Sequence, residues 1–356
     1  MLKSAATPRQ TSGSLLTRQM RKLMAAGTLT LFATILLMVY LMPLLYSFSA
    51  SLKGPVSNLD SMFVPTSAQS VTVQGETYEL YEVPIAGKTR TLALAEKRRA
   101  FSTFIDPAHP ETKIRWQGNW RKLTRATSFD PQWQNYPAAW QAIHFGKLFL
   151  NSFLIAFIGM IATVASSTVV AYGFSRFDIP GKPILFLVLM GTIILPGEVT
   201  LIPLYTVYYK LGWVGTWLPL LAPLFFANAY NVFLLRQFFM SIPRDVDEAA
   251  MMDGASPFRI LVSIIVPQSW PALTATALFH FFYAWNDFFA PFLYLTGKPD
   301  LATLPIGLAS FSTVHGPNQS QLTQAASIMA TVLPLVVFFL AQRVFMRGVV
   351  VTSLEK

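Results

Sequence analysis

Long apolar runs separated by short polar segments make up most of the chain, and six of these runs approach the length that spans a bilayer. A helix needs about 20 mainly apolar residues to cross the hydrocarbon core. The pattern therefore predicts an all-α polytopic membrane protein with six transmembrane helices. The runs cover residues 24–46, 148–174, 183–209, 216–235, 266–295 and 322–340.

A segment with a different pattern, residues 47–147, separates the first run from the second. Its stretch VTVQGETYELYEVPIAGKTRTLALA alternates polar and apolar residues and is rich in Val, Thr and Tyr, with Gly75 and Gly87 at expected turns. Such alternation is typical of half-exposed strands. We therefore expect a small β-rich insert between helices 1 and 2. The remaining parts are an N-terminal tail (1–23), helix 1 (24–46), a helical core (148–346) and a C-terminal tail (347–356).

Lysine and arginine in the short segments indicate the orientation. These residues gather on the cytoplasmic side, and the rule applies to short loops only. Both tails and the loops after runs two and four are basic, whereas the short loops on the other side contribute only Lys210 and Lys298. We expect both termini in the cytoplasm. The insert, with twelve Lys or Arg and eight Asp or Glu, is long enough to translocate regardless of its charge.

Composition supports a membrane protein and excludes several other classes. The chain is 53% hydrophobic and 12% charged, about half the charged fraction of soluble domains. The net charge of +10 is spread over tails and loops, which fits membrane orientation better than a nucleic-acid partner. The chain has no cysteine, and its four histidines are too scattered for a metal site. It also lacks a P-loop motif, so we expect no enzyme activity and no cofactor in this chain.

A polar segment, DEAAMMDGASPFRILVSIIVP, interrupts the apolar pattern between runs four and five. Asp245 and Glu248 have the spacing of a capping box that begins a helix. Gly254 stands where a helix ends, and Ser256 with Pro257 is typical of a second helix start. Local chemistry thus predicts helix, bend and helix on the cytoplasmic side. An interfacial amphipathic hairpin would need nothing more.

The same segment has a second interpretation, because a loop that only reverses the chain needs few residues. Its order is Glu-Ala-Ala, three residues, Gly, nine residues, then Ile264, one residue, Val266 and Pro267. This order resembles the signature of permease subunits of bacterial ATP-binding-cassette importers, with Val266 in place of the usual Leu. The stretches SLKGP, NSFLIA, AYGFSRFDIPGK, LPGEVTLIPLY, WNDFFAPFLYL and QRVFMRGVVVTSLEK are similar to the second, G-type permease subunit of the maltose importer family.

The resemblance covers residues 24–53 and 135–356, and the insert at 54–134 departs from it. It implies a coupling helix at about residues 243–260 that docks on an ATPase subunit. It also implies a second permease subunit, two ATP-binding subunits that carry the ATP, an extracytoplasmic solute-binding protein, and a place in the bacterial inner membrane among lipid. The coupling residues that it implies are Glu248, Ala249, Ala250, Asp253, Gly254 and Ala255.

Polar residues inside the runs are candidates for a substrate path, because burying them in hydrocarbon is costly. A sugar binds through aromatic faces and amide or carboxylate partners within a preformed cavity. A structural role is the competing interpretation for each candidate, and for Glu198 in run three. The candidates for a sugar path are Asn228, Asn231, Asn286 and Asp287.

Two other functions compete with an ATP-driven importer of sugars or oligosaccharides. A secondary transporter driven by an ion gradient would often show internal repeats and several intramembrane charges, and here the runs show no obvious halves and only two acids. A membrane-tethered receptor would bind its ligand through the insert. The importer explains more of the pattern than either.

Overall fold

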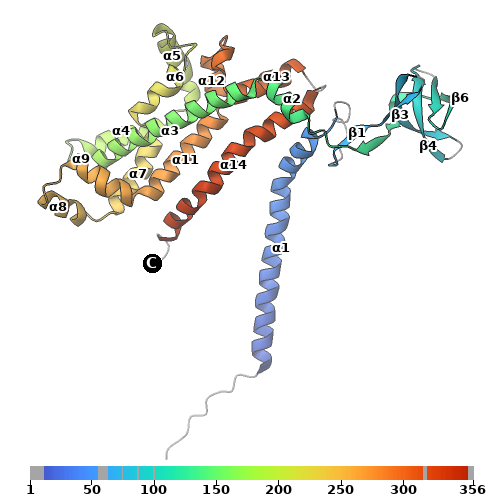
Figure 1. The fold of residues 1–356 in the computed structure, drawn as a ribbon. Coiled ribbons are helices and arrows are strands. Elements are labelled where there is room, and N and C mark those ends of the chain that lie inside the picture. The colour runs from blue at the N-terminus through green and yellow to red at the C-terminus, as the bar shows by residue number, and fades with distance from the viewer. Residues whose placement is uncertain are drawn as a thin grey trace, which may run out of the picture. The chain divides into compact units, whose positions relative to one another are not determined.

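The structure is a computed structural model that describes residues 12–54, 63–73, 75–85, 88–98, 101–315 and 319–351. The side chains of residues 12–19, 198, 315 and 343–351 lie outside this description. The outermost parts of both expected tails, and the expected turn at Gly87, also lie outside it. The chain divides into two compact units, residues 1–132 and 133–356, and Figure 1 shows the elements of each.

Unit 1 contains a long helix, α1 (Ser12–Ser51), and a set of strands. The expected first membrane helix lies within α1, and residues 20–51 are apolar enough to span a bilayer. The strands are β1 (Thr66–Ala68), β2 (Ser70–Val73), β3 (Glu76–Ile85), β4 (Lys88–Glu96), β5 (Phe101–Asp106), β6 (His109–Gln117), β7 (Thr124–Arg125) and β8 (Thr127–Phe129).

The strands build a small sheet with its own core. Strands β2 to β6 pair antiparallel in chain order, β7 pairs with β3, and β1 pairs with β8. Alternate positions face one side, so Tyr81, Val83, Leu92, Leu94 and Phe104 form a buried cluster. Tyr81 donates a hydrogen bond to Glu79, and Arg125 donates one to the Tyr81 hydroxyl oxygen. These bonds hold the Tyr81 hydroxyl at the edge of the core, whereas Nη1 of Arg125 has no hydrogen-bond partner in the described part of the chain.

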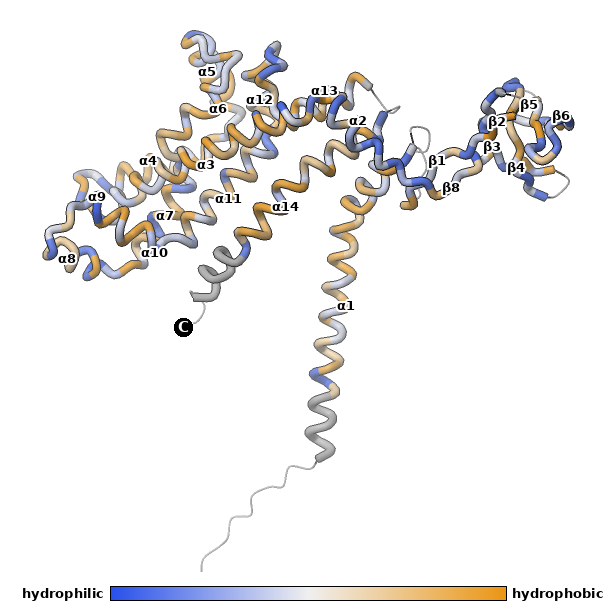
Figure 2. Tube along the Cα trace, viewed as in Figure 1, coloured by the Kyte–Doolittle hydropathy of each residue, from blue (hydrophilic) through white to orange (hydrophobic). Residues whose placement is uncertain are grey.

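Unit 2 is helical. Figure 2 shows hydrophobic residues along most of α3, α11 and α14. The helices are α2 (Asn135–Ala142), α3 (Phe145–Arg176), α4 (Lys182–Ile194), α5 (Gly197–Lys210), α6 (Leu218–Leu221), α7 (Ala229–Ser241), α8 (Asp245–Met252), α9 (Pro257–Ile260), α10 (Val266–Gln268), α11 (Trp270–Asn286), α12 (Phe289–Tyr294), α13 (Leu304–His315) and α14 (Ser320–Val351). Short helical turns are η2 (Trp120–Lys122, in unit 1), η3 (Ala222–Phe226), η4 (Leu261–Ile265) and η5 (Pro299–Leu301).

Four helices of the described residues are long and apolar enough to cross a membrane, and the number rises to six if two bent pairs each count as one span. One pair, 182–194 with 199–210, bends by 99°, and the other, 257–268 with 270–286, bends by 82°. The expected third and fifth spans are therefore broken helices rather than straight ones. Proline explains much of this, since Pro196 lacks a backbone N–H at the first break and Pro271 is the second residue of α11, directly after the second break.

The central helix of unit 2 is α3, which contacts α7 on one side and α11 on another. Its N-terminal half joins a buried cluster with α2, α11, α13 and α14. Its C-terminal half joins a second cluster with α7, α9 and η4. α3 therefore connects the end of the unit that holds α8 and α9 with the end that holds α2 and α13 (Figure 1).

Candidate functional site

The polar segment between α7 and α9 forms the short helix α8. Its first turn carries three acids, Asp245, Asp247 and Glu248. Negative charge near a helix N-terminus interacts favourably with the exposed N–H groups there. The capping box expected from Asp245 and Glu248 is wrong, because the helix begins one residue earlier: the Arg244 carbonyl accepts from the N–H groups of Asp247 (2.9 Å) and Glu248 (3.0 Å), and no side chain caps it.

The end of α8 matches the expectation from the sequence. Gly254 has φ +78, a conformation that side chains with a Cβ disfavour. Its N–H donates to the Met251 carbonyl and the N–H of Ala255 donates to the Ala250 carbonyl, each at 3.0 Å. These paired bonds form a Schellman motif. The Ser256 hydroxyl then accepts from the N–H of Arg259 at 3.4 Å, so the predicted helix, bend and helix are confirmed.

The predicted coupling residues divide between two faces. Ala250 and Ala255 are half-buried and pack against the cluster around α7 and α9. The exposed positions are Glu248, Ala249, Asp253 and Gly254. Sequence reasoning did not select Met251 and Met252, whose exposed fractions are 54% and 88%, or Phe258 at 72%. Flexible methionine side chains adapt well to a partner surface. The position of these residues inside the permease signature could have identified them from the sequence.

Sequence reasoning also missed an ion pair beneath α8. Asp247, the residue before Glu248, is buried, and its Oδ2 lies 2.7 Å from Nε of Arg176 at the end of α3. Burial raises the pKa of the Asp247 carboxyl above its ordinary value, although the guanidinium groups of Arg176 and Arg244 lower it. Seventy-one positions separate the two residues in the sequence, so their contact follows only from the fold.

Three of the four candidate path residues have a local structural role. The Asn228 side chain accepts from the N–H groups of Tyr230 (3.0 Å) and Asn231 (3.3 Å) and so caps α7. Asp287 accepts from the N–H of Ala290 at 3.3 Å where α12 begins. The Asn286 amide donates to the Phe282 carbonyl of its own helix at 2.8 Å. Asn228 and Asn286 are exposed, Asp287 is half-buried and Asn231 is buried.

The cap at Asn228 follows a break in the fourth span. Leu218–Leu221 and Ala222–Phe226 form short turns, and the chain then passes through Ala227 with φ 63 and ψ 150 before α7 begins. The Ser166 hydroxyl of α3 donates to the Leu224 carbonyl at 2.8 Å. A backbone group freed by a helix break inside a membrane needs such a partner.

Replacing Asn228 with alanine is expected to lower the stability of the permease by about 1 kcal/mol, because two N–H groups of α7 lose their acceptor. Thermal unfolding of the purified protein measures the effect. Asn286→Ala is the matched control, since that amide caps no helix, and we expect a smaller change there. Equal losses at both positions would contradict the capping role of Asn228.

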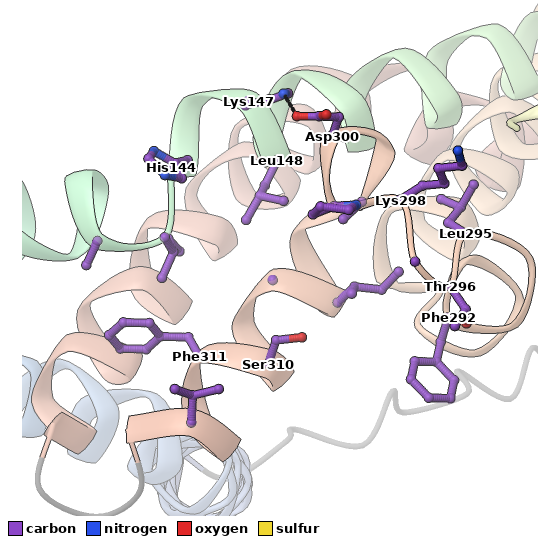
Figure 3. Close-up of a pocket in the computed structure, with 18 residues that line it drawn as sticks. His144, Lys147, Leu148, Phe292, Leu295, Thr296, Lys298, Asp300, Ser310 and Phe311 are labelled. Atoms are coloured by element: carbon purple, nitrogen blue, oxygen red, sulfur yellow. Dashed lines mark hydrogen bonds and ion pairs between the residues drawn. The ribbon is translucent and has the colours of Figure 1, made fainter. Parts of the chain in front are cut away.

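A cavity of about 520 Å³ lies at the other end of unit 2, between the start of α3, α12 and α13. Figure 3 shows Lys147 of α3 paired with Asp300 at its edge. Lys147 holds the pKa of Asp300 below its ordinary value. Asn151 donates to the carbonyls of Asp300 (3.0 Å) and Ala302 (2.9 Å) and so fixes the loop before α13 to α3.

Comparison with known proteins identifies the class of the chain. Residues 148–351, more than half of the chain, match the family model for the inner membrane component of binding-protein-dependent transport systems. The chain belongs to this family. It is therefore a permease of the binding-protein-dependent class and a multi-pass protein of the inner membrane.

Three curated relatives resemble this permease over most of their length. An osmoprotective compounds uptake permease of Synechocystis sp. (strain ATCC 27184 / PCC 6803 / Kazusa) is 32% identical over 77% of this chain and 92% of its own length. An sn-glycerol-3-phosphate permease of Yersinia pestis bv. Antiqua is 35% identical, covering 61% and 79%. A trehalose/maltose permease of Thermococcus litoralis is 34% identical, covering 60% and 77%.

A solved structure shares the fold over nearly the whole chain. A chain of a bacterial ABC transporter that imports the acidic polysaccharide alginate superposes with a TM-score of 0.62. The superposition covers 95% of this chain and 99% of that chain at 18% sequence identity. The likeness establishes the permease fold. The alternative of a secondary transporter is not favoured.

Proposed function

We propose that this permease is one subunit of an ATP-driven importer for sugars, oligosaccharides or related polyhydroxylated solutes. It would form the translocation path together with a second permease subunit. Two ATP-binding subunits would dock on the cytoplasmic side, and an extracytoplasmic solute-binding protein would deliver the solute. The relatives named for trehalose/maltose and for sn-glycerol-3-phosphate support this substrate class.

The observation that carries the proposal is the exposed tip formed by α8 and the start of α9. Its surface combines the exposed acid Glu248 with the apolar side chains of Met251, Met252 and Phe258. Large apolar side chains exposed together on a short segment outside the spans are typical of a protein interaction site. The Schellman bend at Gly254 fixes the direction of this tip. The chain itself would contribute no catalytic group, because the ATP would be bound by the partners.

The polar positions of the broken spans would line the path. Asn228 and Asn286 are exposed in the isolated chain, Asp287 is half-buried, and Tyr283 and Phe289, which lie within four positions of Asp287 in the sequence, are exposed. Amide and carboxylate groups next to aromatic faces match what a sugar needs for recognition. The termini would lie in the cytoplasm and the β-rich insert outside, as the basic short loops indicate.

Substitutions at α8 test the proposed docking site. Glu248→Gln removes the exposed charge, and Gly254→Val places a branched side chain at φ +78, where the backbone disfavours it by roughly 1–2 kcal/mol. We expect each to reduce ATPase co-purification and solute uptake about tenfold, which corresponds to about 1.4 kcal/mol. Asp245→Asn, an exposed acid of the same helix outside the signature, is the control and should retain both.

Normal uptake and normal ATPase association in both variants would overturn the docking assignment. Purification of the wild-type protein addresses the wider proposal. An ATPase that elutes with the permease supports it, whereas uptake driven by an ion gradient through this chain alone contradicts it.

A further inference from the structure

The last turn of α3 contacts the end of α7, the helix α8 and the start of α9, which follow one another in the chain. The Arg176 guanidinium donates through Nη2 to the Ile242 carbonyl at 3.0 Å, where α7 ends. Its Nε lies 2.7 Å from the carboxylate of Asp247 in α8. The Tyr172 hydroxyl donates to the Pro257 carbonyl at 3.2 Å, where α9 begins. One helical turn therefore holds the segment at its start, in its middle and at its end.

Neighbouring helices are attached to the same turn. Arg236 of α7 donates through Nε to the Phe174 carbonyl at 3.4 Å. Its guanidinium carbon lies 4.3 Å from the centroid of the Phe186 ring of α4. Cations this close to an aromatic face are attracted to it. The cytoplasmic end of α3 is thus fixed to α4, α7, α8 and α9.

The ion pair is poorly suited to a purely stabilising role. The side chains of Arg176 and Asp247 are each only 7% exposed. Oδ1 of Asp247 has no hydrogen-bond partner in the described part of the chain, and the Arg176 Nε–H is not aligned for a hydrogen bond despite the short distance. Removing two charges from water costs several kcal/mol each, and an apolar pair is often as stable. What the pair does supply is a specific contact that holds α8 in one orientation relative to α3.

We propose that Arg176 and Asp247 are positioning residues for energy coupling: they lock α8 to α3, so that displacement of α8 by the ATPase moves α3 with it. The proposal rests on the proposed function of α8 as the docking helix. α3 has 32 residues, a length of about 48 Å. At its far end Lys147 and Asn151 hold the loop at Asp300. One rigid helix thus connects the docking helix with the outer cavity.

The test compares an apolar pair with the ion pair in the complete transporter, reconstituted with its ATPase subunits and binding protein. Arg176→Met with Asp247→Leu removes both charges and puts two apolar side chains in their place. We expect the ATPase subunits to co-purify as with wild type, and basal ATP hydrolysis to persist. Uptake per ATP hydrolysed should fall about tenfold. A merely structural pair predicts wild-type uptake in this variant, and that result would overturn the proposal.

A second variant keeps the test decisive if the apolar pair assembles poorly. The chain contains no cysteine, so Arg176→Cys with Asp247→Cys places two unique thiols at the contact. With the thiols reduced, uptake per ATP should be low; a short bifunctional thiol reagent that joins them should restore most of it. If the cross-linked protein does not regain uptake, the proposed mechanical connection between α8 and α3 is wrong. If the docking function of α8 itself is wrong, Glu248→Gln and Gly254→Val will retain ATPase association and uptake, which distinguishes that failure from a failure of the ion-pair link.

Discussion

Replacing Gly159 with alanine should lower the thermal unfolding midpoint of the permease markedly and reduce the amount of assembled protein. Gly159 lies in α3 next to His280 of α11 and to Leu224 in the break of the fourth span. A Cβ there would be 2.7 Å from Nε2 of His280 and 2.9 Å from Cδ1 of Leu224. Real side chains do not approach that closely, so neighbours must move. Overpacking of this kind costs about 1–3 kcal/mol.

His280, the nearer neighbour of Gly159, cannot move without loss. His280 is held within hydrogen-bond distance of the Thr163 hydroxyl, at 3.3 Å. Leu224 belongs to the turn whose carbonyl accepts from Ser166. Gly173→Ala is the matched control in the same helix, because a Cβ added at Gly173 would have no neighbouring side chain within 4 Å. We expect that variant to be unchanged or slightly more stable, by up to about 1 kcal/mol. Equal midpoints for both variants would contradict close packing at Gly159.

The apolar runs predicted six spans, and the described helices supply four that are long and apolar enough to cross a membrane, or six if each bent pair is one span. Length and hydrophobicity, which a bilayer demands, are both visible in a sequence. The bends were not predictable in the same way. Pro196 and Pro271 weaken a helix locally, but the angles of 99° and 82° depend on the helices packed alongside. Proline alone does not decide the outcome: α14 continues through Pro334 as one helix. Tertiary partners select which weak point becomes a break.

In the candidate coupling site, too, features set by neighbouring residues could be predicted and features set by tertiary contacts could not. Gly254, Ser256 and Pro257 act on backbone groups a few residues away, so the bend could be predicted from their order. The helix start was wrong by one residue, because Asp245 lies inside the first turn rather than before it. The Arg176 and Asp247 contact joins positions far apart in the sequence, and no local pattern contains it. Contacts of this kind become visible only when the fold brings their elements together.

Replacing Ala227 with glycine should raise the thermal unfolding midpoint, whereas Ala227→Val should lower it. The backbone at Ala227 has φ 63 and ψ 150, a region that essentially only glycine occupies and that costs other residues of order 1–3 kcal/mol. Glycine removes that cost, and a β-branched side chain increases it. Ala165→Gly, at an exposed position inside α3, is the matched control and should lose about 1 kcal/mol through lower helix propensity.

We expect the strain at Ala227 to affect transport, because this residue lies where the fourth span breaks and directly before the Asn228 cap. Strained backbone in a broken membrane helix persists when surrounding contacts hold it, and here Ser166 and the cap supply them. Relieving the strain should stabilise the present conformation of residues 222–228 relative to any other conformation that this break adopts during transport. Ala227→Gly should therefore be more stable and transport more slowly in reconstituted vesicles. Higher stability with unchanged uptake would show that the break does not move during transport, and lower stability would show that it carries no strain.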